Sequence, residues 1–436
     1  MHAGSVVART IRAMPRDFTR LAILAASLPL AAASPLAARA AGSDEARGAP
    51  PATAPEPAPN SVPTTPPTTL APNAPTLGEV AGAVRARHGV RGLAVAIVDR
   101  TGLRSIAADG DRGGDAGAIV PDDAFHLGSC TKAFTATLAA ALVADGRLRW
   151  NSTIGEVFGA ADAGLAIEAG WRDATLEELL RHRGGAPAEP DRSDWMRAFA
   201  CGAAPEACRA EFVAAMLARP PAQQRGTPVY SNQGYAIAGR MIELAGGAPY
   251  EAQLASRVLA PLGIARFGFG PPSRVDPAAP RGHAGDGALR DIDNPSAIAP
   301  AGTLHMPLGE WAKFVAFHLG AAPPDALAGA ARELEALHRA APEEPREALG
   351  WRTATRPWGG AVLHHAGSNT MWFAVAWLSP SRGFAVLAAS NQGGDAAAKA
   401  CDEACAAAIA RWSEMAPAQA SEGAAPRAID RATDAP

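Results

Sequence analysis

The sequence of 436 residues predicts a mixed α/β (α+β) fold, with one sheet flanked by helices and interrupted by a mainly helical lobe. Two short apolar runs within residues 92–108 have the alternation and turn signals of strands, and similar runs return after residue 360. Between them, residues from about 130–300 indicate helices joined by long irregular connections. Strands at both ends with helices between them indicate that the two ends of the folded part build a single sheet.

Residues 1–40 have the composition of an export signal. A region with four separate arginines precedes an apolar stretch at 21–33, and residues 38–40 (Ala-Arg-Ala) have the small-x-small pattern of a cleavage site. The apolar stretch is broken by prolines and is short for a membrane span. No adjacent arginine pair and no cysteine before Cys130 occur, which favours the general secretory route without a lipid anchor. We therefore expect a periplasmic or secreted protein with no stable membrane insertion after cleavage.

The folded domain is predicted to span residues 76–415, with its helical lobe at about 130–300. Residues 41–75 are rich in Pro, Ala and Thr, a composition that cannot bury a core and favours a disordered linker. The tail at 416–436 has a similar composition, and we expect disorder there too. The domain between them is long enough for one large unit with two lobes.

Individual elements follow from periodicity. Five short apolar or alternating runs bounded by turn residues are predicted strands: residues 92–98, 103–108, 360–365, 371–377 and 384–389. Five stretches have helical spacing or composition: residues 76–87, 133–144, 176–182, 235–244 and about 395–412.

Charge and composition exclude several classes of function. The formal net charge is −3 and is spread along the chain with no basic run, so nothing favours nucleic-acid or anionic-membrane binding. Residues 109–115 resemble a calcium loop, but Gly113 and Val120 stand where an EF-hand needs a ligand and a glutamate. We expect no metal, no cofactor and a monomeric protein.

Ser129 and Lys132 carry the strongest chemical signal. They lie three residues apart at the start of the predicted helix at 133–144, so both side chains share one face and the amine can reach the hydroxyl. Unpaired N–H groups at a helix N-terminus favour negative charge, which suits covalent acyl transfer. The alternative is that Ser129 only caps a core helix. Against it, the chain has three lysines among its 40 basic residues, and a desolvated lysine can lose a proton that arginine keeps.

Tyr230 and Asn232 form a second candidate group before the helix at 235–244. Ser231 or Asn232 is expected to cap that helix, which would be a purely structural role. Tyr230 lies just before the cap, in a loop from which its phenol can point outward. His182 lies where another predicted helix breaks, and we interpret it as structural rather than catalytic.

Three motifs appear in order along the chain: Ser129-x-x-Lys132, Tyr230-x-Asn232 and His365-Ala366-Gly367. Together they resemble the serine β-lactamase and penicillin-binding protein family, in particular its class C-like branch. The resemblance covers about residues 76–413. It implies a β-lactamase/transpeptidase-like fold, with an antiparallel sheet built from both termini, and it includes D-alanyl-D-alanine carboxypeptidases and esterases.

The resemblance also implies roles for individual residues. Ser129 would attack an acyl carbonyl, Lys132 would take its proton, and Tyr230 would pass protons to the leaving group and later from a water. The oxyanion hole is expected at the backbone N–H groups of Ser129 and Ser368. The expected substrate-binding residues are Asn232, His365, Gly367 and Ser368.

The third motif departs from the Lys-Thr-Gly pattern common in this family. His365 is expected to be neutral or partly charged near pH 7, so binding of β-lactam carboxylates should improve at lower pH. Ala366 lacks a hydroxyl that helps to hold a substrate carboxylate, and Ser368 or Asn369 is expected to compensate. Without compensation, a substrate without a carboxylate, such as an ester, is favoured. The structural alternative for His365 is a histidine at a strand edge beside His364.

The sequence thus predicts an exported serine hydrolase that cleaves amide bonds through a Ser129 acyl-enzyme, as β-lactamases and D-alanyl-D-alanine carboxypeptidases do. Its partner would be a small-molecule or peptidoglycan-derived substrate. A carboxylesterase of the same fold is the alternative, together with a penicillin or peptidoglycan sensor that acylates without turnover. The presence of Lys132 and Tyr230 favours turnover.

The cysteines suggest one disulfide. In an oxidising compartment, Cys201 and Cys208 can close a short loop. Cys401 and Cys405 are four residues apart on a predicted helix, a poor geometry for a bridge. Cys130 is expected to be a buried free thiol.

Overall fold

The computed structural model describes residues 75–161, 164–342 and 344–415, and all structural statements below concern these parts of the chain. The predicted export signal and C-terminal tail, and all but the last residue of the predicted linker, lie outside the described residues. Export and disorder of these segments therefore stay predictions.

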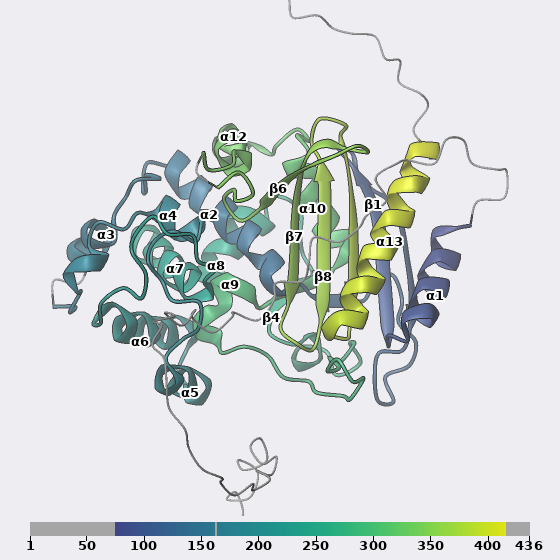
Figure 1. Ribbon diagram of the computed structural model, residues 1–436, viewed down its shortest axis with the longest axis horizontal. Coiled ribbons are helices and arrows are strands. Elements are labelled where there is room, and N and C mark those ends of the chain that lie inside the picture. The colour runs from purple at the N-terminus through teal and green to yellow at the C-terminus, as the bar shows by residue number, and fades with distance from the viewer. Residues whose placement is uncertain (1–74, 162–163, 343, 416–436) are drawn as a thin grey trace, which may run out of the picture. The chain divides into compact units, whose positions relative to one another are not determined.

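The main sheet has six antiparallel strands in the order β2-β1-β9-β8-β7-β6 (Figure 1). Its strands are β1 (Gly92–Asp99), β2 (Gly102–Gly110), β6 (Arg352–Arg356), β7 (Gly360–Ser368), β8 (Phe373–Ser379) and β9 (Phe384–Ser390). Strand β1 pairs with its hairpin partner β2 and with β9, so that Val95 lies opposite Ala388. The two ends of the folded part therefore meet in one sheet, which confirms the predicted fold class.

Both faces of this sheet are covered. Alternate residues of β1 point to opposite sides: Leu93, Val95 and Ile97 belong to one buried cluster, and Ala94 and Ala96 belong to the other. Helices α1 (Leu77–His88) and α13 (Gly394–Met415) cover the first side, whereas α10 (Leu308–His318) and the helical lobe cover the second (Figure 1). Each buried Val, Leu or Ile stabilises the fold by about 1.5–3 kcal/mol, which explains the continuous apolar run in this strand.

Helix α1 begins and ends within a residue of its predicted limits. Thr76 forms a capping box with Glu79: the Thr76 Oγ1 accepts the Glu79 N–H at 3.2 Å, and the Glu79 carboxylate accepts the Thr76 N–H at 2.7 Å. Gly89 ends the helix in the left-handed conformation, with φ of 64°. The sequence signals at both ends are therefore satisfied.

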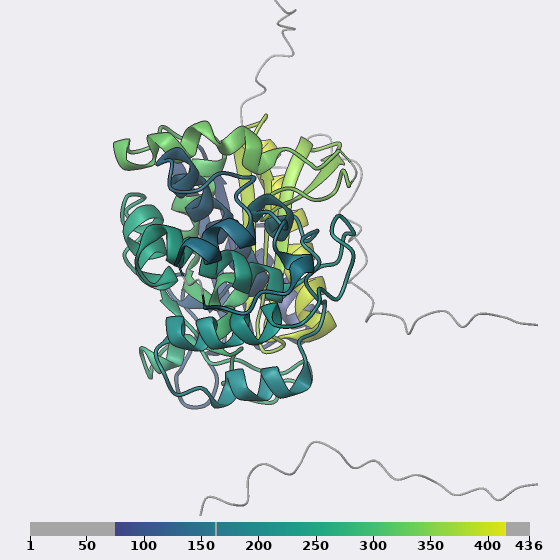
Figure 2. The ribbon, with the colours of Figure 1, turned by 90° about the vertical axis from the view of Figure 1, so that its left-hand side faces the viewer.

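The inserted lobe is mainly helical, as predicted (Figure 2). Helix α2 (Thr131–Ala144) runs through its centre and is buried on nearly every side, because small alanines allow neighbours to approach all round it. Its other α-helices are α3 (Ile154–Ala161), α4 (Leu176–Leu180), α5 (Arg192–Ala200), α6 (Pro205–Leu217), α7 (Asn232–Gly246), α8 (Tyr250–Leu254) and α9 (Ala299–Gly302), and α11 (Ala328–Arg332) and α12 (Leu334–His338) follow later in the chain.

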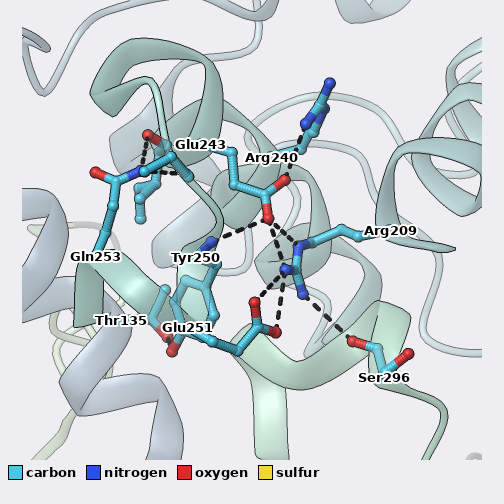
Figure 3. A network of polar contacts seen from close by, with 10 residues as sticks. Thr135, Arg209, Arg240, Glu243, Tyr250, Glu251, Gln253 and Ser296 are labelled. Carbon is cyan, nitrogen blue, oxygen red and sulfur yellow. Dashed lines mark hydrogen bonds and ion pairs between the residues drawn. The ribbon is translucent and has the colours of Figure 1, made fainter. Parts of the chain in front are cut away.

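A buried ion cluster joins three helices of the lobe (Figure 3). The fully buried Arg209 of α6 donates from Nη2 to Glu243 of α7 at 2.6 Å and to Glu251 of α8 at 3.0 Å. It also donates to the carbonyl of Ser296 at 3.3 Å. Burial raises the pKa of Glu251, and the charge of Arg209 opposes that shift. The sequence did not reveal this cluster, because its members are far apart in the chain.

The predicted disulfide between Cys201 and Cys208 is confirmed, and it links the end of α5 to α6 with a Cα–Cα distance of 5.9 Å. Cys130, Cys401 and Cys405 are buried free thiols, as expected. Burial raises the pKa of each of these three thiols. Within the described ranges, no helix is both long and apolar enough to cross a bilayer.

Two features differ from the sequence prediction. A second sheet of three short strands has the order β3-β5-β4, formed by β3 (Ala124–His126), β4 (Gly268–Phe269) and β5 (Leu304–Pro307). Strand β6 extends the main sheet at its edge. The short strands are too brief for a periodic pattern, and β6 has the polar sequence Arg-Thr-Ala-Thr-Arg of an exposed edge.

Candidate active site

Ser129 lies in a single 3₁₀ turn, Gly128–Cys130, that leads into α2. The end of β7 is pressed against this turn. A Cβ atom on Gly128 would lie 2.4 Å from the Ser368 nitrogen, and one on Gly367 would lie 2.5 Å from the Ser129 nitrogen. Gly128 also has a positive φ of 51°. Glycine at both positions is therefore required for the backbone N–H groups of Ser129 and Ser368 to come together.

Lys132 is fully buried and has three oxygen neighbours. Its Nζ lies 3.1 Å from Ser129 Oγ, 2.7 Å from Asn232 Oδ1 and 2.8 Å from the Ala301 carbonyl oxygen. The amide and carbonyl oxygens can only accept hydrogen bonds, so each takes one N–H. A neutral amine has two N–H groups and one lone pair, which leaves the lone pair for the Ser129 hydroxyl. The geometry therefore fits an amine that accepts the serine proton.

Burial lowers the pKa of Lys132 to about 7, and the nearby Cys130 partly offsets this effect. None of its three oxygen neighbours carries a formal charge, so removal from water dominates. Lys132 can consequently exchange a proton near neutral pH.

Tyr230 completes the group around the nucleophile. Its hydroxyl donates to Ser129 Oγ at 2.8 Å, and its ring lies 4.7 Å from Lys132 Nζ. Tyr230 is 43% exposed, so the site is open to solvent on this side. Desolvation of the hydroxyl raises the pKa of Tyr230, and the hydrogen bond to Ser129 opposes that shift. The phenol is therefore neutral and can donate a proton at neutral pH.

Ser231, and not Asn232, provides the N-cap of α7. Its hydroxyl accepts the Gly234 N–H at 3.1 Å and donates to the Pro187 carbonyl at 2.6 Å, so Ser231 caps α7. Asn232 is the first helical residue, and its side chain is free to reach Lys132.

His182 supports Tyr230 and Ser231 from behind. Its Nδ1 accepts the Ser231 N–H at 3.0 Å, and its ring lies 4.4 Å from the ring of Tyr230. It has a positive φ of 60°, which is uncommon for a residue with a side chain. Burial holds the pKa of His182 well below its ordinary value. These contacts agree with the structural role expected for it.

Of the two states expected for His365 near pH 7, neutral or partly charged, the structure supports the neutral one. The side chain is buried, with its Nδ1 2.7 Å from the Ala366 carbonyl oxygen. Burial, with the charge of Lys132 as a second cause, lowers the pKa of His365 to about 3. The imidazole is therefore neutral near pH 7. His364 points to the opposite face and stacks on Trp377 at 4.3 Å.

The positions after the third motif differ in their availability. Asn369 is buried: its Nδ2 donates to Asp293 Oδ1 at 2.8 Å, and its Oδ1 accepts the Met371 N–H at 3.1 Å. Both ends of its amide are therefore engaged inside the protein. Ser368 is exposed, and its hydroxyl accepts the Thr370 N–H at 2.9 Å. Ser368 remains the better candidate to replace the hydroxyl absent at Ala366.

Asp293 was missed by sequence reasoning. It stands in a loop, far along the chain from the residues it contacts, and no spacing pattern pointed to it. No group of three or more His, Cys, Asp or Glu side chains that could hold a metal occurs in the described parts of the chain.

Residues 77–409 match the model of the Beta-lactamase family, and the chain belongs to this family. Its members are serine hydrolases of the fold described here. Penicillin-binding protein 4 of Amycolatopsis lactamdurans is 32% identical over 186 residues, which cover 42% of this chain and 45% of that protein. Unguisins hydrolase ungD' of Aspergillus campestris is 26% identical over 294 residues, covering 63% of this chain and 53% of that protein. The chain thus spans about half the length of these relatives.

A solved structure shares the fold. The class C β-lactamase from Rhodobacter sphaeroides superposes with a TM-score of 0.64 at 16% identity, and the match covers 77% of this chain and 99% of that one. At this identity the likeness supports the fold alone.

Proposed function

We propose that this chain hydrolyses amide bonds through an acyl-enzyme on Ser129, with β-lactams or D-alanyl peptides as its substrate class. One observation carries the proposal: Lys132 Nζ lies 3.1 Å from Ser129 Oγ while two acceptor oxygens hold its N–H groups. The name of the penicillin-binding protein relative supports this class of substrate.

Acylation begins when Ser129 Oγ attacks the substrate carbonyl carbon and its proton passes to the neutral Lys132 amine. The carbonyl oxygen becomes an oxyanion, held by the N–H groups of Ser129 and Ser368. When the carbon–nitrogen bond breaks, Tyr230 donates its proton to the leaving amine and recovers one from Lys132. Loss of one oxyanion donor typically costs about 2.7–4 kcal/mol of transition-state stabilisation.

Deacylation uses the same groups in reverse. A water attacks the ester carbon, and its proton passes to the Tyr230–Lys132 pair. The ester bond to Ser129 breaks, and Ser129 Oγ takes a proton back as the acid leaves. Asn232 Oδ1 lies 2.7 Å from Lys132 Nζ, and we assign Asn232 contact with the substrate as well.

A second candidate function is ester hydrolysis. It is favoured by the neutral state of His365, because an uncharged imidazole gives a substrate carboxylate no ion pair. Ala366 offers no hydroxyl, and its methyl group packs with the cluster on the α1 and α13 side of the sheet. Short acyl esters need only the nucleophile and the oxyanion hole.

We also propose that the chain is exported by its first 40 residues and acts as a monomer in the periplasm or outside the cell. The disulfide between Cys201 and Cys208 supports an oxidising compartment. Cell fractionation and the N-terminal sequence of the mature protein test export, with a new terminus after Ala40 as the expected result.

Intact-protein mass spectrometry tests the reaction. The protein is mixed with benzylpenicillin or p-nitrophenyl acetate, and a transient adduct on the wild type is expected, with release of product. Ser129→Ala should form no adduct, whereas Ser256→Ala, at an exposed serine of the lobe, should behave as the wild type. A lasting penicillin adduct without product identifies a sensor. An adduct on Ser129→Ala overturns the assignment.

A further inference from the structure

Asp293 is a buried carboxylate that the proposed mechanism does not use. Its side chain is 1% exposed, and each of its oxygens accepts one hydrogen bond from a different part of the chain. Oδ2 lies 2.9 Å from His126 Nε2, and Oδ1 lies 2.8 Å from Asn369 Nδ2. A buried carboxylate must have such partners, because an unpaired one is costly to remove from water.

The first arm leads to the nucleophile turn. His126 is fully buried at the end of β3, and its Nδ1 accepts the Gly128 N–H at 3.1 Å. Because Nδ1 accepts, the ring hydrogen lies on Nε2 and points at Asp293. Gly128 directly precedes Ser129, whose N–H is one donor of the proposed oxyanion hole. The first arm therefore fixes the peptide before that donor.

The second arm leads to the turn between β7 and β8. Asn369 holds Asp293 through Nδ2 and accepts the Met371 N–H at 3.1 Å, so its amide spans this turn. Thr370 within the turn has a positive φ of 73°, a conformation that a non-glycine residue adopts only when its surroundings enforce it. Asn369 directly follows Ser368, whose N–H is the second proposed donor.

We propose that Asp293 is a positioning residue that sets the distance and direction of the two oxyanion-hole donors. This inference rests on the proposed function. The donors come from separate segments, at Ser129 and Ser368, and an oxyanion needs both N–H groups at about 2.7–3.1 Å. One rigid carboxylate that receives one hydrogen bond from each flank joins the two segments through His126 and Asn369.

The variant Asp293→Asn keeps the side-chain volume nearly constant but can accept only one of the two hydrogen bonds, from His126 or from Asn369. Both partners present N–H donors, but an amide has one acceptor oxygen and one NH₂ group. One arm therefore stays bound while the other meets a donor it cannot pair with. Asn369→Ala removes the second arm alone and leaves the His126–Asp293 contact intact.

The test compares acylation by p-nitrophenyl acetate and benzylpenicillin in stopped flow, together with the infrared carbonyl band of the acyl-enzyme. Asp293→Asn is expected to slow acylation about tenfold or more, with substrate affinity nearly unchanged. This effect is smaller than the loss of about 10²–10³ in rate that follows complete removal of one oxyanion-hole donor. The acyl carbonyl band of Asp293→Asn should move to higher wavenumber, because the oxyanion hole polarises the ester less. A general loss of stability does not move this band.

Two further variants complete the test. Asp194→Asn is the matched control, because Asp194 is also buried and paired on both oxygens, with Arg197 and Arg219. It should keep the wild-type rate and band. Asn369→Ala should show the same slow acylation and the same shifted carbonyl band. If Asp293→Asn does not fold, Asn369→Ala alone tests the positioning role.

The outcomes separate this inference from the proposed function. Wild-type rate and band in folded Asp293→Asn and Asn369→Ala overturn the positioning role, while acylation of the wild type keeps the proposed function. Absence of any Ser129 adduct on the wild type overturns both. In the double variant Asp293→Asn/Asn369→Ala, the loss of transition-state stabilisation is expected to be smaller than the sum of the two single losses. Both substitutions break the same link between the two oxyanion-hole donors.

Discussion

Lys132 is removed from water by burial, and this loss of hydration makes its amine able to accept a proton from Ser129. An exposed lysine keeps its proton at neutral pH, and a buried one beside a carboxylate would keep it as well. Here Ser129, Asn232 and Ala301 provide three oxygen atoms without formal charge, and burial lowers the pKa of Lys132 to about 7. Arginine in the same place would remain protonated.

The rate of acylation is therefore expected to rise with pH and to level off above about 7, where Lys132 is neutral. The measurement is kcat/KM for p-nitrophenyl acetate between pH 5 and 9, corrected for spontaneous hydrolysis. Lys132→Arg should reduce the rate about a hundredfold or more at every pH, since a general base is lost. A flat profile, or more than about a tenth of the rate in Lys132→Arg, would show that another group is the base.

At this scale the sequence indicated part of the site. The spacing of Ser129 and Lys132 was sufficient to predict their contact, because helix geometry is local. The choice between a neutral and a partly charged His365 was not accessible, since it depends on burial by segments distant in the chain. Asp293 was also out of reach, because its role comes from two hydrogen bonds that only the folded chain brings together.

Between elements, the decisive contact is that of β7 with the turn before α2. A Cβ atom on Gly367 would lie 2.2 Å from the Leu127 carbonyl oxygen and 2.5 Å from the Ser129 nitrogen. Both are backbone atoms, which cannot move aside as a flexible side chain can. The glycine of the third motif is thus a condition for the approach of a strand to a helix.

Gly367→Ala should therefore push β7 away from the turn and slow acylation about a hundredfold, the effect of a misplacement of about 1 Å. Ester turnover and the far-ultraviolet circular dichroism spectrum are measured together. Gly78→Ala in α1 is the control, because its nearest contact would be at 3.9 Å, and full activity is expected. Normal activity in folded Gly367→Ala would contradict the tight contact.

Element prediction succeeded where the pattern was long. Helices α1, α2 and α13 have capping signals or sustained composition, and their limits lie within a few residues of those expected. Strands β3 and β4, with three and two residues, owe their pairing to distant partners. A pattern of two or three residues carries no period, so these strands could be found only in the folded structure.

For the molecule as a whole, the ion cluster around Arg209 connects α6, α7 and α8, and the last two of these helices contact α2. Arg209 Nη2 donates to Glu243 and Glu251, and the ring of Tyr250 lies 5.3 Å from the Arg209 guanidinium. The Tyr250 hydroxyl lies 2.8 Å from Thr135 Oγ1 on α2 (Figure 3). The cluster thus ties the outer helices of the lobe to the helix that carries Lys132.

Arg209→Ala is expected to lower the free energy of unfolding by about 3–5 kcal/mol, because it removes the cation from Glu251 and leaves Glu243 with Arg240 as its cation. Urea denaturation followed by fluorescence gives this value. Arg192→Ala, at an exposed position of α5, should change it by less than about 0.5 kcal/mol. A loss in Arg209→Ala as small as that of the control would show that the cluster contributes little.

The position of β1 in the sheet has a consequence for the order in which the chain acquires its structure. Strand β1 and its hairpin partner β2 are synthesised early, but the other edge of β1 pairs with β9, where Ala94 lies opposite Ala389. Until that late segment is made, an apolar strand with an unpaired edge is open to other chains. Closure of a loop of this length is slow, and such edges favour aggregation. A partner that covers β1 during synthesis would therefore reduce aggregation of this chain more than it would for a chain built from successive hairpins.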